Sequence, residues 1–316
     1  MISFADCGLA IGHATDADGA TGCTVIRGAE DAFACGVHVP GRATGTRELT
    51  LLEPTQLVDR VDAILLAGGS AYGLDAAAGV MKWMEERGRG FPVGGGVVPI
   101  VPGAVIFDLA PLGRFDARPT AAMAYDACEH ATATPMQGSI GAGTGATVGK
   151  IVGADRCSKG GLGLAAADRD GLMVRALAVV NALGDVRNAR GDIIAGAHDA
   201  DGSWLDSEVF IARGRRDAAS FAAVAARNTT LCVVATNAAL DRAQLAALAR
   251  ASTAALYRRI TPVGTLYDGD VVFATAPRSG GVRIDSSQLE VLAVMALEQA
   301  IERAVATSTP GEVRQT

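Results

Sequence analysis

The sequence feature that most constrains the fold is an alternation of two kinds of segment. Short apolar runs end at glycine, and longer segments between them have apolar residues at helical spacing. Residues 63–67 (Ala-Ile-Leu-Leu-Ala) are a predicted strand that stops at Gly68-Gly69. Apolar residues then recur at helical spacing over residues 74–88. Strands and helices are both predicted along the whole chain, so we expect a mixed α and β fold.

The other predicted elements follow the same rules of apolar spacing, turn residues and caps. Further predicted strands are residues 32–39, a proline-broken region at 97–107, 172–183, 231–236 and 271–274. Further predicted helices are residues 119–131, 217–226, 240–260, and a last helix capped by Ser286 or Ser287 that ends near residue 306. Residues 138–149 are a predicted glycine-rich loop, and residues 184–215 a predicted exposed connector.

Composition and charge exclude several classes of protein. A net charge of −6 and few aromatic residues (4%) argue against a nucleic-acid-binding protein. The first residues lack a basic region followed by an apolar run, so we expect no signal peptide. The longest uncharged stretch, residues 91–107, contains three prolines and is a poor membrane helix. Six scattered cysteines indicate buried, reduced thiols, and we therefore expect a soluble, cytoplasmic protein.

The glycine loop at residues 141–146 fits the pattern G-x-G-x-x-A, which occurs in dinucleotide-binding sites. That site requires a preceding strand, and residues 134–138 do not look like one. A phosphate-binding P-loop requires glycine at 144 and serine or threonine at 151, where this chain has Thr144 and Ile151. We therefore favour a tight loop in which backbones approach closely, with Lys150 at its end.

Motifs for metal or serine-hydrolase chemistry are weak. The four histidines and six cysteines have no metal-ligand spacing, so we expect neither a metal nor an organic cofactor. Ser70 stands in a Gly-Ser-Ala-Tyr-Gly segment that lacks the G-x-S-x-G spacing of a nucleophile elbow.

Asn228-Thr229 lies between a predicted helix and a predicted buried strand. A threonine hydroxyl is a weak nucleophile, but an N-terminal threonine has its own α-amine as base, and that amine titrates near pH 7.7–8.0. Self-cleavage through attack on the preceding carbonyl would expose such a threonine. Asp268-Gly269-Asp270 would by itself be a turn before a strand, although an extended segment would point both carboxylates the same way.

The sequence resembles the DmpA-type self-processing peptidases, the L-aminopeptidase/D-amidase/esterase group that includes nylon-oligomer hydrolases. The resemblance covers nearly the whole chain. Its marks, in the family's order, are residues 12–15, 45–48, 68–75, 101–108, 141–150, 228–230, 233–238 and 268–270.

The resemblance implies an αββα sandwich of the DmpA and ornithine acetyltransferase type, an α+β fold similar in its layers to the N-terminal nucleophile hydrolases. It also implies that the single domain 1–316 cuts itself between Asn228 and Thr229. The products would be a large chain, 1–228, and a small chain, 229–316, which stay together and form a homo-oligomer.

The same resemblance implies the roles of the site residues. Thr229 matches the nucleophile, and Asn181 matches the asparagine that helps to hold the oxyanion. Lys150, Asp268 and Asp270 match a lysine and an acidic pair of the nylon-hydrolase branch.

Three differences place the chain nearer the threonine branch than the β-peptide-cleaving branch. The β-peptide-cleaving branch has a serine nucleophile where this chain has Thr229, and a tyrosine where it has Phe107. It also has a Ser/Glu pattern where this chain has the acidic pair Asp268 and Asp270.

We therefore predict a self-processing aminopeptidase or amidase that acts on a small peptide or linear amide through an acyl-enzyme. Two alternatives stay open from the sequence. One is an acyltransferase of the ornithine acetyltransferase type, which passes the acyl group to an amine. The other is an unprocessed, non-enzymatic binding protein, for example one that binds a nucleotide at residues 141–150. Tyr72, Phe107 and residues 184–215 are expected to shape the substrate pocket.

Overall fold

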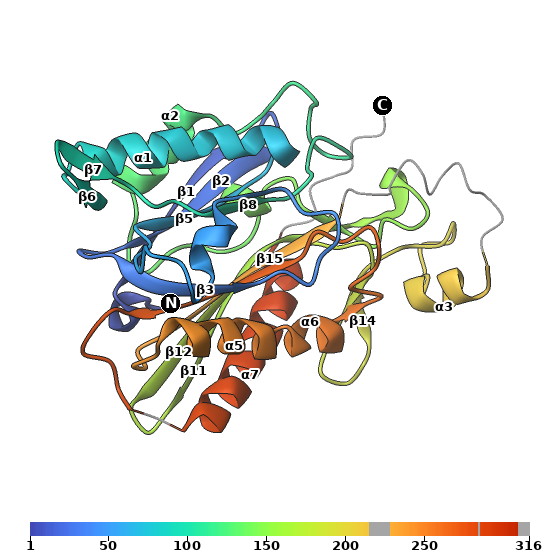
Figure 1. Ribbon diagram of the computed structural model, residues 1–316. Helices are drawn as coiled ribbons and strands as arrows, with labels where there is room; N and C mark the ends of the chain where they lie inside the picture. The colour runs from blue at the N-terminus through green and yellow to red at the C-terminus, as the bar shows by residue number, and fades with distance from the viewer. Residues whose placement is uncertain (215–227, 284, 309–316) are drawn as a thin grey trace.

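The computed structural model describes residues 1–214, 228–283 and 285–308, and two five-stranded mixed sheets form its centre (Figure 1). The first sheet has the order β1 (Leu9–Asp16), β2 (Thr21–Gly28), β5 (Ala63–Ala67), β8 (Gly103–Val105), β4 (Thr46–Arg47). The second has the order β11 (Gly161–Arg169), β12 (Leu172–Asn181), β15 (Thr229–Thr236), β17 (Val271–Pro277), β3 (Phe33–His38). The pairs β5–β8 and β15–β17 are parallel, and the other pairs in the two sheets are antiparallel.

The two sheets pack face to face because their strands are apolar on both sides. Along β15, Leu231 and Val233 point into a core shared with Ile26 and Leu66 of the first sheet. Their neighbour Val234 points the other way, into the core beneath the helices of the second sheet. A strand buried on both faces reads as a continuous apolar run, as residues 231–235 do.

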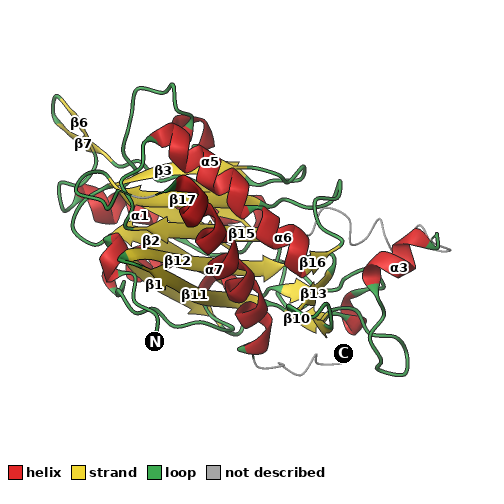
Figure 2. Cartoon of the chain, turned by 90° about the horizontal axis from the view of Figure 1, so that it is seen from below, coloured by secondary structure: helices red, strands yellow, loops and turns green. Residues whose placement is uncertain are grey.

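Helices cover the outer face of each sheet (Figures 1 and 2). The first sheet is covered by α1 (Ala77–Glu85) and α2 (Ala121–Glu129). The second sheet is covered by α5 (Arg242–Ser252), α6 (Ala254–Arg259) and α7 (Ser286–Ala306), and Figure 2 shows α5 and α7 crossing its strands. This four-layer arrangement confirms the predicted αββα sandwich.

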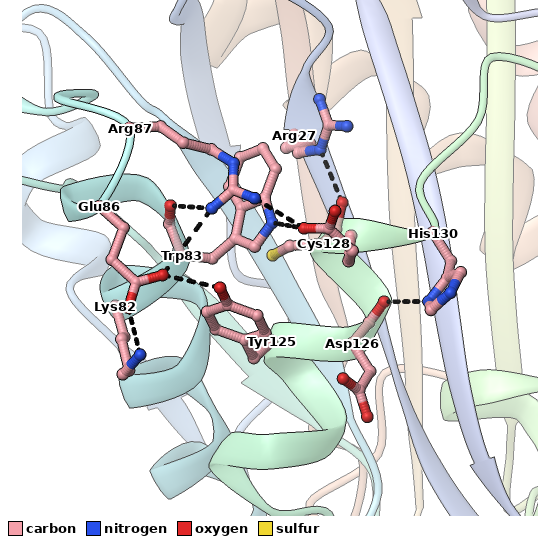
Figure 3. A network of polar contacts seen from close by, with 10 residues as sticks. Arg27, Lys82, Trp83, Glu86, Arg87, Tyr125, Asp126, Cys128 and His130 are labelled. Atoms are coloured by element: carbon pink, nitrogen blue, oxygen red, sulfur yellow. Dashed lines mark hydrogen bonds and ion pairs between the residues drawn. The ribbon is translucent and has the colours of Figure 1, made fainter.

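A polar network ties the two helices of the first layer together (Figure 3). Trp83 on α1 donates from Nε1 to Glu129 on α2 at 2.7 Å, and Arg87 donates to the same carboxylate oxygen at 2.7 Å. Tyr125 of α2 donates at 2.7 Å to Glu86, the residue that follows α1. The network is structural: it fixes the spacing of the helices over the first sheet.

Smaller elements connect the layers. They are β6 (Phe91–Val93), β7 (Gly96–Val98), β9 (Thr147–Val148), β10 (Ser158–Lys159), β13 (Asp185–Arg187), β14 (Ile193–Ala195), α3 (Ser207–Ala212) and β16 (Ile260–Thr261). The described part of the predicted connector, residues 184–214, contains two strands and a helix, and α3 lies to the side of the sandwich in Figure 1. The helix predicted over 217–226 lies outside the described residues.

Three predicted elements differ in detail. The helix predicted over 74–88 begins instead as a 3-10 turn, Ser70–Ala76, followed by α1. The helix predicted over 240–260 is divided into α5 and α6 at Thr253. The last helix is capped by Asp285, whose carboxylate accepts from the Ser287 N–H, and the prediction of a serine cap is wrong.

The cysteines are buried and free of disulfides, as predicted from their scattered positions. Among the helices of the described ranges, none combines the length and apolar character that crossing a membrane would require.

Candidate active site

The Asn228–Thr229 bond lies at the buried start of β15. The antiparallel register places Thr229 opposite Asn181, the last residue of β12. Thr229 is 5% exposed and Asn228 is 1% exposed. The Thr229 hydroxyl donates a hydrogen bond to the carbonyl oxygen of Asn228 at 2.6 Å. The hydroxyl therefore lies against the carbonyl group that precedes it in the chain.

Lys150 reaches the same strand end from a different segment. Its ammonium donates to the Asn181 side-chain oxygen at 2.9 Å, to the Asn181 carbonyl at 3.0 Å and to the Thr147 carbonyl at 2.8 Å. Burial lowers the pKa of Lys150 to about 7, while Cys157 and Asp268 act in the opposite direction. The lysine is therefore able to change charge near neutral pH.

Glycine geometry brings Lys150 into position. Gly149 has φ +73°, a conformation that favours glycine, and its N–H donates to the Gly184 carbonyl at 3.0 Å. The N–H of Lys150 donates to the Leu183 carbonyl at 3.1 Å. The end of the glycine loop is thus bonded to the chain that follows β12, close to Asn181.

Asn181 is held by its amide oxygen. That oxygen accepts from the Thr147 N–H at 3.1 Å as well as from Lys150, and the amide nitrogen donates to the Phe107 carbonyl at 3.2 Å. The two donors identify this atom as the amide oxygen, and the other atom is therefore the NH₂ group, a hydrogen-bond donor.

The acidic pair approaches the strand end from the other side. Asp268 forms a parallel bridge with Asn228, and the carboxylate of Asp270 accepts from the Thr230 N–H at 2.6 Å. Both aspartates are 2% exposed. Burial raises the pKa of Asp268, and burial together with the charge of Asp268 raises the pKa of Asp270 to about 8. Two acids so close together do not both ionise readily.

The segment 268–270 is not the turn that its composition favours. The turn falls at residues 266–267, and Asp268 is already extended against Asn228. The extended alternative is the correct one, because pairing with Asn228 and Thr230 outweighs the local preference of Asp and Gly for turns.

The predicted site residues Lys150, Asn181, Asn228, Thr229, Asp268 and Asp270 thus meet at one place. They come from the glycine loop, the end of β12, the start of β15 and the segment before β17. Strand pairing brings together residues that lie up to 120 positions apart in the sequence.

A family model described as Peptidase family S58 matches residues 5–315. The chain belongs to peptidase family S58. It is 44% identical over 257 residues to an uncharacterized aminopeptidase of Mycobacterium leprae, a match that spans 76% of this chain and 66% of that protein's length. It is 32% identical over 283 residues to a 6-aminohexanoate-oligomer endohydrolase of Agromyces sp., over 87% of this chain and 74% of that protein. The chain is accordingly a hydrolase of the S58 family with aminopeptidase and amidase relatives.

Solved structures of proteins with distant sequences show the same fold. A Burkholderia sp. β-aminopeptidase superposes with a TM-score of 0.70 at 21% identity, over 96% of this chain and 86% of that one. An L-aminopeptidase D-Ala-esterase/amidase from Ochrobactrum anthropi, described as a variant of the Ntn hydrolase fold, gives a TM-score of 0.69 at 19% identity, over 95% of this chain and 84% of that one. The fold of this S58 hydrolase is therefore the Ntn-like DmpA sandwich.

A cavity of about 390 Å³ lies beside the glycine loop. Thr147 borders it and also contacts both Asn181 and Lys150. Ile194, His198 and Trp204 supply another wall, and they belong to the connector that was expected to shape a pocket. Tyr72, expected there too, stacks instead under the Arg118 guanidinium, 3.5 Å from its ring centre.

The glycine loop supports the site of the S58 chain, and its geometry does not match a nucleotide cradle. Gly141–Gly143 form a 3-10 turn, and strand β9 follows where a phosphate-binding loop would open a helix. The Thr15 and Thr24 hydroxyls accept from the N–H groups of Gly141 and Ala142 at 2.8 and 3.1 Å. The tight-loop interpretation is the one the geometry supports.

Four main-chain groups of the site, from three residues, could not be identified from the sequence. These are the Phe107 carbonyl, the Thr147 N–H and carbonyl, and the Gly269 N–H, which donates to the Asn228 carbonyl at 2.8 Å. The glycine between two aspartates was the one available signal, because glycine allows close approach of a backbone.

Proposed function

We propose that this S58 hydrolase cuts itself between Asn228 and Thr229 and then uses Thr229 as an N-terminal nucleophile on the amide bonds of small peptides or linear amides. The observation that carries the proposal is the 2.6 Å contact between the Thr229 hydroxyl and the carbonyl oxygen of the bond to be cut. Thr229 is buried beside a lysine and two carboxyl groups, and burial of several titratable groups together is typical of a catalytic site.

In the proposed self-cleavage, Thr229 Oγ1 attacks the Asn228 carbonyl carbon. The C=O electron pair moves to the oxygen, and the hydroxyl proton passes through a neighbouring group to the Thr229 nitrogen as the C–N bond breaks. The resulting ester is opened by water. The products are the Asn228 carboxylate and a Thr229 with a free amine and a free hydroxyl.

In the proposed hydrolysis of substrate, the freed α-amine takes the hydroxyl proton while Oγ1 attacks the substrate carbonyl. The Asn181 NH₂ group donates to the developing oxyanion, and loss of one such donor costs roughly 2.7–4 kcal/mol in other hydrolases. Lys150 holds the Asn181 oxygen at 2.9 Å, so it positions that donor. Asp268 and Asp270 orient the new amine.

The names of relatives support an amide substrate. One relative is named as an uncharacterized aminopeptidase and another as a 6-aminohexanoate-oligomer endohydrolase, and both names denote cleavage of an amide bond. We propose that water, rather than an acceptor amine, takes the acyl group.

The experiment compares the wild type with Thr229→Ala and Thr230→Ala. Thr230 is the next residue on the same strand and is also buried, 0% exposed against 5% for Thr229, so Thr230→Ala is a matched control. We expect Thr229→Ala to lose hydrolysis of aminoacyl amides and Thr230→Ala to keep it. An active Thr229→Ala enzyme would exclude the proposed nucleophile. Products analysed with and without an acceptor amine separate hydrolysis from acyl transfer.

A further inference from the structure

The Asn228 carbonyl oxygen accepts a hydrogen bond from a main-chain N–H group that has no role in the mechanism proposed above. The Gly269 N–H donates to it at 2.8 Å. The same oxygen accepts from the Thr229 hydroxyl at 2.6 Å. This carbonyl is the group that self-cleavage must convert to a tetrahedral oxyanion, so the Gly269 N–H already points at the atom on which charge will develop.

The donor is held from both sides. On one side the Asp268 carbonyl accepts from the N–H groups of Arg42 and Ala43 at 2.7 and 3.0 Å, and its carboxylate accepts from the Thr265 N–H at 2.8 Å. On the other side Asp270 accepts from the Thr230 N–H at 2.6 Å. A donor fixed in this way needs little reorganisation when charge appears, which is the condition for effective oxyanion stabilisation.

Only a residue without a side chain fits between the two aspartates. A Cβ on Gly269 would lie 2.7 Å from the Thr229 hydroxyl oxygen and 2.6 Å from the Ala43 carbonyl oxygen, closer than real Cβ atoms come. The glycine therefore lets the N–H reach the Asn228 carbonyl without displacing the hydroxyl. This accounts for a Gly in the middle of Asp268-Gly269-Asp270, which the roles of the two carboxylates leave unexplained.

We infer that the main-chain N–H of Gly269 is an oxyanion donor for the self-cleavage of the Asn228–Thr229 bond. The inference rests on the proposed self-processing. When Oγ1 adds to the Asn228 carbon, the carbonyl electron pair moves to the oxygen that Gly269 already contacts. When the C–N bond breaks, the double bond re-forms and the contact weakens. Water, which opens the resulting ester, is the one further reactant.

The direct test replaces the N–H by an oxygen atom and changes little else. Cell-free translation with a suppressor tRNA charged with glycolic acid places an ester at position 269. Loss of one oxyanion donor lowers rates by about 10²–10³-fold in other hydrolases. We expect the rate of self-cleavage, followed on a gel as the disappearance of the full-length chain, to fall by the same factor. The matched control is the same ester at Gly88, whose N–H donates to Glu85 at 2.9 Å beyond the end of α1.

The outcomes separate this inference from the proposed function. Slow cleavage with the ester at 269 and wild-type cleavage with the ester at 88 support it. Wild-type cleavage of both esters overturns it, while cleavage of Thr229→Ala would overturn the proposed function instead.

If the ester chain at 269 does not fold, judged by circular dichroism, Gly269→Ala and Gly94→Ala replace it. Gly94 has open space around its Cα, so its alanine variant is a control for composition. Because a Cβ at 269 also meets the Thr229 hydroxyl, slowed cleavage in Gly269→Ala alone supports the inference when a crystal structure of the variant keeps that hydroxyl against the Asn228 carbonyl. Equal rates overturn it.

Discussion

Replacing Asp270 with asparagine should remove a large part of the pH dependence of stability. Burial and the neighbouring Asp268 raise the pKa of Asp270 from 3.8 to about 8. A carboxyl whose pKa is raised on folding contributes stability that is fully present below pH 3.8 and is lost as the pH rises through about 8. An asparagine side chain has no ionisable group, so the Asp270→Asn chain lacks this loss.

The size of the effect follows from the linkage slope. Between the two pKa values, each pH unit costs about 1.4 kcal/mol, so stability should fall by about 3 kcal/mol from pH 5 to pH 7 through this group. Asparagine keeps an oxygen for the Thr230 N–H, which Asp270 accepts at 2.6 Å. Its NH₂ group replaces a carboxylate oxygen that has no hydrogen-bond partner in the described part of the chain. Burying this NH₂ group without a partner lowers the stability by an amount that does not depend on pH.

The assay is urea unfolding at pH 5 and pH 7 in a Thr229→Ala background, where the chain is expected to stay uncut. The free energy of unfolding of the parent should fall with pH by a few kcal/mol more than that of the Asp270→Asn chain. Asp170→Asn is the control, because the Asp170 side chain is 81% exposed, and its profile should run parallel to the parent. Parallel profiles for Asp270→Asn as well would refute the assignment of a buried, proton-holding carboxyl at 270.

Three further predictions concern the lysine, the glycine loop and the core. Lys150→Met should lower kcat for amide hydrolysis by about 10²-fold, because it releases the amide that positions the oxyanion donor; an unchanged kcat would contradict that role. Gly149→Ala should destabilise by roughly 2 kcal/mol or more, since its Cβ would lie 2.0 Å from a backbone nitrogen, whereas Gly94→Ala should change the melting temperature little. Phe273→Ala, in the core between the sheets, should cost about 3–5 kcal/mol in urea unfolding and Phe115→Ala, 62% exposed, about 0.5 kcal/mol; equal costs would contradict the assignment of the core.

Elements whose identity depends on local pattern could be predicted from the sequence. The strand at 63–67 matches β5 at both ends, because a fully apolar run that begins after Asp62 and ends at Gly68-Gly69 has one stable place, between two packed layers. The layer order followed from the family resemblance and was confirmed.

Details that depend on side-chain competition could not be predicted. The helix breaks at Thr253, where two neighbouring hydroxyls bond back to the preceding turn. The Ser252 hydroxyl donates to the Leu248 carbonyl at 2.7 Å and the Thr253 hydroxyl donates to the Ala249 carbonyl at 3.2 Å. Contacts of this kind bend helices. At the last helix, Asp285 precedes two serines that are equally good caps by composition.

Within the site, residue types could be predicted and main-chain roles could not. Lys150, Asn181 and the acidic pair were assigned through the family resemblance, since composition alone favoured a turn at residues 268–270. The Gly269 N–H is invisible in a sequence, because its direction depends on the bridge between Asp268 and Asn228, 40 residues apart. That pairing exists only once β15 and β17 are assembled.

The central claim, that Thr229 becomes an N-terminal nucleophile by self-cleavage, is tested most directly by the intact masses of the purified, denatured wild type and Thr229→Ala. The account predicts two chains in the wild type, with the masses of residues 1–228 and 229–316, and one uncut chain in the variant. A single full-length chain in the wild type, or a cut at another bond, would contradict it.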